Sequence, residues 1–303
     1  MSYRKEQQYS LDYTKDASKE LGIDFSIYSL QDLRKLWREF LENGMHGICF
    51  SIYEDGQEPG DRITEEQVER RIKILKPYVQ SIRSFSCIEG NQYVPKIAKK
   101  HGLKTMVGAW LSDDLEKNEE ELEALIVLAK KGYVDIAAVG NEVLYRNDLT
   151  LKQLLTYIKR VKKAVPKVTV GYVDAYYEFS NHPELVDVCD VVLSNCYPFW
   201  EGCPQQYSLQ HMRKMYQQAK QAAGGKKIII TETGWPSQGG NEGKAIASVE
   251  NAMQYFINTQ LWAQEEGIDT YYFSSFDESW KVGDEGDVGA YWGLWNKYEN
   301  LKF

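Results

Sequence analysis

The chain has 303 residues, and 43% of them are hydrophobic, which is enough for a large core and argues against wholesale disorder. The formal net charge of −8 argues against a nucleic acid or an anionic membrane as partner, because both attract basic proteins. A single α/β barrel typically takes ~250 residues, so this length suits one domain with an extension.

The first stretch of the chain, MSYRKEQQYSLDYTKD, is polar and lacks the apolar core of a signal peptide. No run anywhere approaches the ~18 apolar residues of a membrane span. We therefore expect a soluble protein with no membrane partner, either cytoplasmic or the mature form of a secreted protein. The compartment and the oligomeric state stay open.

A helix is predicted over residues 31–43, before the first predicted strand. Its apolar residues recur at helical spacing and would face inward. We expect residues 1–45 to form an N-terminal extension whose helix packs on a domain formed by residues 46–303. The inward-facing residues are Leu33, Leu36, Trp37, Phe40 and Leu41.

Eight short runs rich in β-branched and aromatic residues predict strands. Most are continuously apolar rather than alternating, as expected when helices cover a parallel sheet. They start about once per thirty residues, which is the size of a strand–helix unit. The predicted strands span residues 47–53, 81–87, 104–110, 135–141, 167–173, 190–198, 227–233 and 270–276.

Helix signals lie between these runs. Threonine followed three residues later by glutamine fits a capping box, in which each side chain satisfies a free backbone donor of the other residue. Glycine after the last apolar position favours a helix end. The capping-box pairs are Thr64 with Gln67 and Thr150 with Gln153, the other expected starts are Asn118 and Ser248, and the expected ends are Gly132 and Gly267.

Eight strands alternating with helices predict an α/β fold of the (β/α)8 TIM-barrel type, in a single domain with an N-terminal helical extension. An open doubly wound sheet usually has fewer strands and, for nucleotide binding, a glycine-rich first turn. No such turn occurs, and GGNEGKA (239–245) departs from the phosphate-loop pattern. No helix comparable to that of residues 31–43 follows the eighth strand, so we expect the N-terminal helix to fill the eighth outer position.

Cysteine and histidine give no metal-binding pattern. The five cysteines are an odd number without compact disulfide spacing, and the four histidines are scattered. Buried free thiols are therefore expected, and no metal or other cofactor is indicated.

Two predicted strand ends deliver a glutamate. The fourth strand leads into Glu142 and the seventh into Glu232. Reactive groups of such barrels lie at the carboxyl ends of strands, so these two would face each other across the barrel mouth. Glycoside cleavage needs a carboxyl pair of this kind. The Asn-Glu dipeptide itself recurs at 118–119 and 241–242, so the prediction rests on placement.

Four longer strings carry a resemblance to a known family. They are VGNEV (139–143), SNCYPFW (194–200), ITETGWPS (230–237) and FDESWK (276–281), in this order and on the predicted strands. Through them, residues 46–295 resemble glycoside hydrolase family 17, in the clan whose acid/base lies on strand four and whose nucleophile lies on strand seven. The resemblance implies a retaining enzyme that acts on β-1,3-glucan through a covalent glycosyl-enzyme intermediate.

The resemblance also implies roles for individual residues. Glu142 would be the general acid/base and Glu232 the nucleophile. Asn141 would hydrogen-bond the sugar 2-hydroxyl, and Tyr197 would hydrogen-bond Glu232. Different environments would have to drive the two carboxyl pKa values apart.

Six further residues are candidate sugar contacts. Each has a plainer interpretation, which is core packing for the aromatic residues and a solvated surface pair for the charged ones. The candidates are Trp235 and Phe276 as walls of the reacting subsite, Glu278 and Lys281 as contacts of the nucleophile region or of sugar hydroxyls, and Tyr53 and Trp110, at strand exits, as stacking platforms.

Three functions are compatible with these residues. The leading hypothesis is a hydrolase of laminarin-like β-1,3-glucan, and the alternative is a β-1,3-glucanosyltransferase that uses the same two glutamates. A non-catalytic glucan-binding protein is the third, although both carboxylates are intact. The long N-terminal segment and the loop of residues 279–295 depart from plant-type members, so endo or exo action and chain-length preference stay open.

Overall fold

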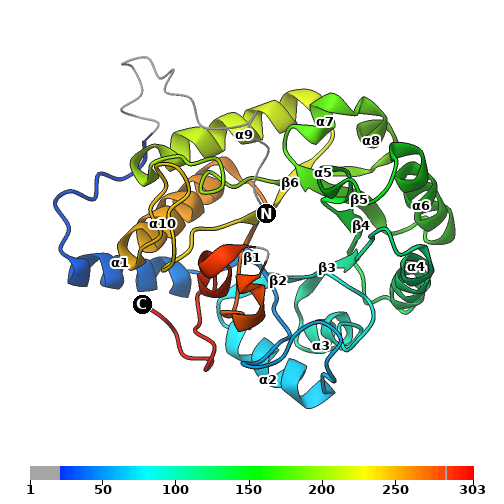
Figure 1. Ribbon diagram of the computed structural model, residues 1–303, viewed down its shortest axis with the longest axis horizontal. Helices are drawn as coiled ribbons and strands as arrows, with labels where there is room; N and C mark the ends of the chain where they lie inside the picture. Colours follow the sequence, from blue (N-terminus) through cyan, green and yellow to red (C-terminus); the bar gives the residue numbers. More distant parts are fainter. Residues whose placement is uncertain (1–20, 284) are drawn as a thin grey trace.

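The computed structural model describes residues 21–283 and 285–303. Within them, eight parallel strands close into a barrel in chain order, because β8 pairs with β1 as each other strand pairs with the next. Figure 1 shows the helices around the outside of this barrel. The predicted (β/α)8 barrel is confirmed. The strands are β1 Met45–Cys49, β2 Val79–Ser84, β3 Lys104–Ala109, β4 Ile136–Asn141, β5 Thr169–Ala175, β6 Val191–Asn195, β7 Ile228–Thr233 and β8 Thr270–Tyr272.

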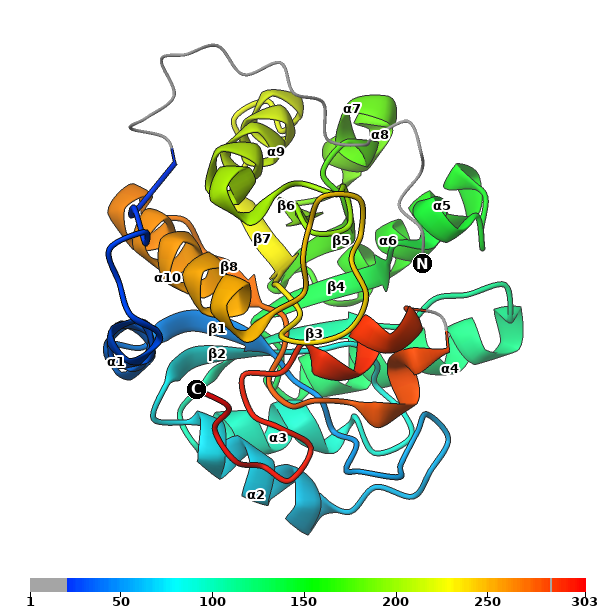
Figure 2. The same cartoon turned by 60° about the vertical axis from the view of Figure 1, so that its left-hand side comes forward.

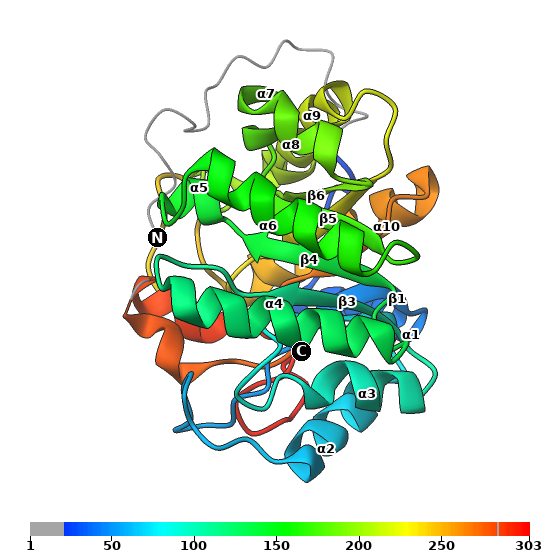
Figure 3. The same ribbon diagram turned by 90° about the vertical axis from the view of Figure 1, so that its right-hand side faces the viewer.

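The helices that connect the strands are amphipathic and turn their apolar faces inward. Figure 3 shows α4 and α6 lying along the outside of β3 and β4. The α-helices are α1 Leu30–Glu42, α2 Glu65–Leu75, α3 Tyr93–Lys100, α4 Leu115–Lys130, α5 Val143–Arg146, α6 Leu151–Ala164, α7 Glu178–Asn181, α8 Pro183–Val188, α9 Ser208–Ala222 and α10 Val249–Glu266; the 3-10 turns are η3 Gln205–Tyr207, η4 Ser279–Val282 and η5 Gly286–Tyr291.

The first and last strands are shorter than predicted, and β1 begins at Met45, one residue before the expected domain boundary. The apolar runs continue past both strand ends, but their backbone groups find irregular partners there. Ser51 N–H donates to the Ser275 hydroxyl at 2.9 Å, and Ser274 N–H donates to the Trp292 carbonyl at 3.0 Å. These residues are buried without being in the barrel ladder, which the hydrophobic pattern does not distinguish from a strand.

Two of the expected helix starts differ in detail. Helix α4 begins after Asp114, whose side chain accepts the Lys117 N–H, whereas Asn118 lies inside the helix and bonds the backbone of Ser112. Thr64 caps α2, but the Gln67 amide donates to the Ile52 carbonyl at 2.7 Å instead of completing a capping box. Both side chains tie the helix to the preceding loop.

The remaining helix signals are confirmed. The capping box of Thr150 and Gln153 is complete, and Ser248 caps α10 through the Asn251 N–H. Gly132 and Gly267 follow α4 and α10 in the left-handed conformation that glycine adopts without steric cost.

Helix α1 corresponds to the helix predicted over residues 31–43. Ser29 and Asp32 form a capping box at its start, and Leu33, Trp37 and Leu41 are buried. The Trp37 ring packs against Phe256 of α10 at a centroid distance of 5.4 Å. In Figures 1 and 2, α1 lies in the outer ring between α10 and α2. We propose that the N-terminal segment supplies the eighth outer helix in this way.

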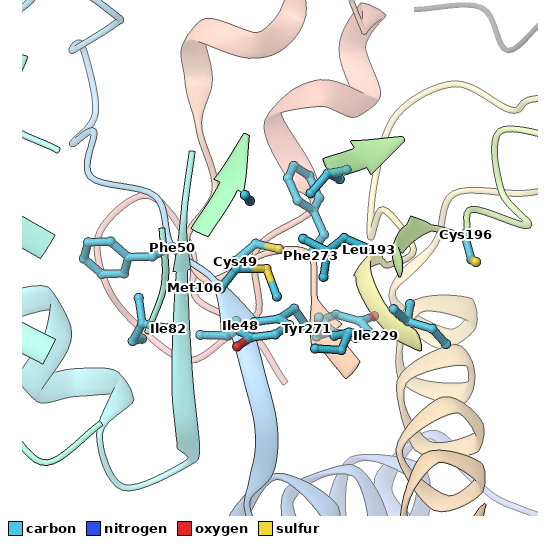
Figure 4. Close-up of a cluster of buried hydrophobic side chains, with 14 of the residues drawn as sticks. Ile48, Cys49, Phe50, Ile82, Met106, Leu193, Cys196, Ile229, Tyr271 and Phe273 are labelled. Carbon is cyan, nitrogen blue, oxygen red and sulfur yellow. The ribbon is translucent and has the colours of Figure 1, made fainter. Parts of the chain in front are cut away.

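Side chains from opposite sides of the barrel meet in one buried apolar cluster. Figure 4 shows Ile48 of β1, Ile82 of β2 and Met106 of β3 in the same cluster as Leu193 of β6 and Ile229 of β7. The five cysteines are buried free thiols, as the sequence predicted. A continuous core of this kind holds the strand ends in fixed relative positions.

Candidate active site

Glu142 stands directly after β4 in a left-handed backbone conformation, with φ of +52°. The pairing of β4 with β5 becomes irregular between Ala138 and Asn141, and the Glu142 N–H then donates to the Val173 carbonyl at 2.8 Å. A non-glycine residue in this region costs of order 1–3 kcal/mol and persists only where surrounding contacts hold it. Such strain concentrates at functional sites, which makes this turn a candidate.

Glu232 lies in β7, where the pairing with β6 is irregular and brings it opposite Asn195. The Asn195 Nδ2 donates to Glu142 Oε1 at 2.9 Å and to Glu232 Oε1 at 3.1 Å. Because both bonds meet at one nitrogen, Glu142 Oε1 and Glu232 Oε1 can be no farther apart than the sum of these two lengths. That limit lies below the ~6.5–9.5 Å of inverting glycosidases and agrees with the ~5–5.5 Å of retaining ones.

Arg83 of β2 binds the nucleophile candidate from the opposite side. One guanidinium nitrogen donates to Glu232 Oε1 at 2.8 Å, and the other donates to Asn141 Oδ1 at the same distance. The side chain is almost completely buried, so its charge acts on Glu232 with little screening by water. The Tyr197 hydroxyl donates to Glu232 Oε2 at 2.8 Å, which is the contact the sequence analysis expected.

The two glutamates lie in different electrostatic environments. Burial raises the pKa of Glu142 to about 8, and the negative charges of Glu232 and Asp174 act in the same direction. The hydrogen bond from Asn195 opposes this rise. Glu232 is held by three donors, of which the Arg83 guanidinium is positively charged. Glu142 therefore holds a proton at neutral pH, while Glu232 is the carboxyl group that the positively charged Arg83 contacts.

The pair lies in a cleft of about 470 Å³ at the carboxyl ends of the strands. Tyr53, Trp110, Glu278 and Lys281 line it, together with the catalytic candidates. Its further aromatic lining is Phe50, Phe85, Tyr145, Trp200, Phe273 and Trp280. Flat apolar faces beside hydrogen-bonding groups are what a pyranose ring requires.

Glu278 and Lys281 form an ion pair inside the cleft. The Lys281 Nζ lies 2.7 Å from Glu278 Oε2 and 4.3 Å from the centroid of the Phe273 ring. The negative charges of Glu278 and Glu285 raise the pKa of Lys281, although burial acts against them. Lys281 is therefore a cation held at the cleft wall, rather than one of a solvated surface pair.

The described residues, 21–283 and 285–303, hold no cluster of three His, Cys, Asp or Glu side chains that could bind a metal ion. In the same part of the chain, no helix combines the length and the apolar composition needed to cross a membrane.

Comparison with known proteins assigns the chain to a family. The sequence model of the BtgE/BtgC glycoside hydrolase domain matches residues 47–293. The chain belongs to this family. The match spans the whole barrel from β1 to the segment after η5.

Individual relatives agree with the family assignment. Proteins described as glucan 1,3-beta-glucosidase from Saccharomyces cerevisiae and Candida albicans are 29% and 30% identical over 260 and 258 residues, covering 78% and 77% of this chain and 83% of each relative. The structure of a glycoside hydrolase family 17 β-1,3-glucanosyltransferase from Rhizomucor miehei is 30% identical, with a TM-score of 0.77, and covers 86% of this chain and 96% of its own. The predicted resemblance to glycoside hydrolase family 17 is confirmed.

Two of the sugar-contact predictions are wrong for this family member. Trp235 is buried against Phe199 and Tyr255, and its indole N–H donates to the Ile246 carbonyl at 2.9 Å. Phe276 has no exposed surface and lies under the Arg71 guanidinium, 4.4 Å from the ring centroid. Both residues are buried and neither belongs to the lining of the cleft.

Sequence reasoning missed Asn195, which contacts both glutamates, and Arg83, which contacts Glu232 and Asn141. Arg83 carried a signal, since a charged residue inside an apolar predicted strand needs a buried partner. Asn195 lay inside the family string SNCYPFW without a role. Trp200 and Tyr145, which line the cleft, have no pattern that separates them from core aromatic residues.

Proposed function

We propose that this BtgE/BtgC family member is a retaining glycosidase that cleaves β-1,3-glucan, with Glu142 as acid/base and Glu232 as nucleophile. The carrying observation is the single Asn195 nitrogen that hydrogen-bonds both carboxyl groups, since it keeps the two bonded oxygens closer together than the ~6.5–9.5 Å of inverting enzymes. If Asn195 bonded only one of the two glutamates, the distance between the two carboxyl groups would have no such upper limit.

The first chemical step uses the different states of the two glutamates. Glu142 donates its proton to the glycosidic oxygen as the bond between that oxygen and the anomeric carbon breaks. The Glu232 carboxylate attacks the same carbon and forms a covalent glycosyl ester. Arg83 and Tyr197 orient Glu232, and Asn141 is held by Arg83 next to it, where a sugar 2-hydroxyl would lie.

The second step reverses these roles. Glu142, now a carboxylate, accepts a proton from an incoming hydroxyl group, and that oxygen attacks the anomeric carbon as the ester bond to Glu232 breaks. When the hydroxyl belongs to water, the outcome is hydrolysis. When it belongs to another sugar, the outcome is glucanosyl transfer.

The substrate class is inferred from the relatives and from the cleft. Relatives at 29–30% identity bear the name glucan 1,3-beta-glucosidase, and the structural neighbour has been solved in complex with laminaritriose. The aromatic lining of the cleft can stack on successive glucosyl units. A β-1,3-glucan oligosaccharide or polysaccharide is therefore the proposed partner.

Transfer is a second candidate outcome, favoured by the residues around the acid/base. The departing and incoming sugars bind on the side of Glu142. Tyr145 belongs to α5, which follows Glu142, and Trp110 lies 4.6 Å from the Arg146 guanidinium of the same helix; both aromatic side chains line the cleft. Aromatic platforms on this side retain a sugar acceptor in competition with water. The similarity to a glucanosyltransferase at 30% identity points in the same direction.

Azide trapping tests the assignment of the two glutamates. Glu142→Ala and Glu232→Ala would each be incubated with 2,4-dinitrophenyl β-laminaribioside and sodium azide. Because azide replaces the missing group, E142A should yield the β-glycosyl azide and E232A the α-glycosyl azide, identified by anomeric NMR. The opposite pair of products, or wild-type turnover of laminarin by Glu142→Gln or Glu232→Gln, would overturn the assignment.

Sizing the products from laminari-oligosaccharides of defined length separates the two outcomes. Products longer than the substrate indicate transfer, and only shorter products indicate hydrolysis. Binding of laminari-oligosaccharides by the wild-type chain without any new product would support the non-catalytic alternative instead.

A further inference from the structure

The acid/base candidate belongs to a short segment that has little stability of its own. Residues 142–146, which we term the acid/base arm, comprise Glu142 and the four residues of α5. Both flanking residues, Glu142 and Asn147, adopt left-handed conformations. One helical turn does not persist by itself in water, so contacts from elsewhere must hold the arm.

Two side chains of β5 bind the backbone of the arm. The Leu144 N–H donates to the Tyr172 hydroxyl at 3.0 Å, and that hydroxyl donates in turn to Asp174 Oδ2. Asp174 also accepts the backbone N–H groups of Tyr145 and Ala175. This pair therefore satisfies two of the free donors at the start of α5, those of Leu144 and Tyr145.

Burial of the Asp174 carboxyl group is unfavourable for the stability of the fold. Its side chain is completely buried and has no cationic partner in hydrogen-bond distance among the described residues. An ionisable group in such a site loses its hydration, and an apolar residue of similar volume generally gives a fold that is at least as stable. A role in the reaction accounts for a carboxyl group at this position.

Charged groups from several elements surround Glu142. Glu232 of β7 and Asp174 of β5 disfavour its ionised form, while Arg146 on the arm favours it. Arg83 of β2 acts mainly on Glu232 and Asn141, to which it is bonded. Burial raises the pKa of Asp174 to about 7, so it ionises before Glu142, whose pKa is raised to about 8.

We propose that Asp174, acting with Tyr172, is a positioning residue for the acid/base: it fixes the arm that carries Glu142 and keeps the proton on Glu142 until the leaving oxygen accepts it. This inference rests on the proposed glycosidase function. It assigns Asp174 to the steps in which Glu142 transfers a proton, so formation of the glycosyl-enzyme from a substrate that needs no protonation provides the test.

The experiment compares two leaving groups in the wild type, Asp174→Asn and Tyr172→Phe. Laminari-oligosaccharides have a poor leaving group that needs the acid, whereas 2,4-dinitrophenyl β-laminaribioside does not. D174N should lower kcat/KM for the oligosaccharide by about 10- to 100-fold, part of the ~10²–10⁴-fold that general acid catalysis contributes. The rate of dinitrophenolate release before turnover should change little. The alkaline limb of the pH profile of kcat/KM should move to lower pH, because removing the negative charge of Asp174 lowers the pKa of Glu142.

Asp277→Asn is the matched control, since Asp277 is a buried carboxyl bonded to Lys302 at 2.9 Å and lies outside the cleft lining. Any defect of D277N should affect both substrates equally. An equal loss on both substrates in D174N would overturn the proposal, as would an unchanged alkaline limb of the pH profile.

The Tyr172→Phe variant keeps the charge of Asp174 but loses the hydroxyl that bridges Asp174 and Leu144. It therefore tests the geometry of the acid/base arm if D174N fails to fold, and equal losses on both substrates in Y172F would also overturn the proposal. A wild-type chain inactive on both substrates would refute the glycosidase function instead.

Discussion

Arg83 and Asn195 give the two glutamates unequal surroundings. Arg83 is bonded to Glu232 and to Asn141, whereas Asn195 contacts both glutamates with one neutral amide. A retaining mechanism needs one protonated and one ionised carboxyl group at the same pH. The buried Arg83 guanidinium lies next to Glu232, whereas burial and the neighbouring carboxyl groups of Glu232 and Asp174 raise the pKa of Glu142.

The pH dependence of wild-type activity follows from the state of Glu142. Glu142 must carry its proton to protonate the leaving oxygen, and its raised pKa of about 8 keeps it protonated at neutral pH. We expect kcat/KM on laminari-oligosaccharides to fall as the pH rises through about 8, which a pH–rate profile measures. With a dinitrophenyl leaving group, release of dinitrophenolate should lack this limb. A limb near the ordinary carboxyl pKa of 4.5 would contradict the prediction.

Removing the two hydrogen bonds that the Arg83 guanidinium donates to Glu232 and Asn141 should slow the formation of the glycosyl-enzyme. Arg83→Met deletes the charged donor to Glu232 and frees Asn141, so kcat should fall by about 10²–10³-fold, as for other donors at a reacting group. Arg83→Lys should retain more activity than R83M but less than wild type, because an ammonium group cannot span both partners. Steady-state kinetics of proteins with unchanged circular dichroism would test this, and wild-type kcat in R83M would refute it.

At the scale of single elements, α1 and α5 show that the place where a helix packs matters more for its role than its length does. Helix α5 is one turn, yet it follows directly on Glu142, the proposed acid/base, and β5 side chains hold it there. Helix α1 precedes the barrel in sequence but packs beside α10, where a helix following β8 would otherwise lie. After β8 the described chain forms only the 3-10 turns η4 and η5, whose segment contributes Lys281 and Glu285 to the cleft.

Truncation of Trp37 tests the contribution of α1 to stability. Trp37 has no exposed surface and packs on Phe256 and Phe303, so Trp37→Ala should cost about 3–5 kcal/mol of unfolding free energy. Leu30→Ala on the same helix is the control, because Leu30 is exposed and its loss should stay within about 0.5 kcal/mol. Urea denaturation would compare the two, and a W37A protein as stable as L30A would show that α1 is dispensable.

At the scale of the whole molecule, the barrel has a continuous core that extends from the strands to the surrounding helices. All five cysteines are buried free thiols, at 1% exposure or less, and four of them, all except Cys203, belong to this core. Burial raises the pKa of Cys49, Cys189 and Cys196 to about 12, so these thiols resist ionisation as well as access. Global packing therefore governs their reactivity.

Thiol labelling measures this packing. The native protein should react with essentially no Ellman's reagent, and all five thiols should react after unfolding in guanidinium chloride. The melting temperature should be the same with and without reductant, because no disulfide contributes. Rapid labelling of any cysteine in the native state would show that the core opens locally around it.

The sequence by itself determined the barrel, its strand order and the two glutamates at the ends of β4 and β7. These follow from local patterns: apolar runs about one strand–helix unit apart, helix caps, and family strings at strand exits. Tertiary structure alone decided that Arg83 and Asn195 join the glutamates, that Asp174 lies behind Glu142, and that Trp235 and Phe276 are buried. These contacts depend on barrel closure and on irregular pairing at the ends of β4 and β7, where a shift of one residue changes which side chain faces the cleft.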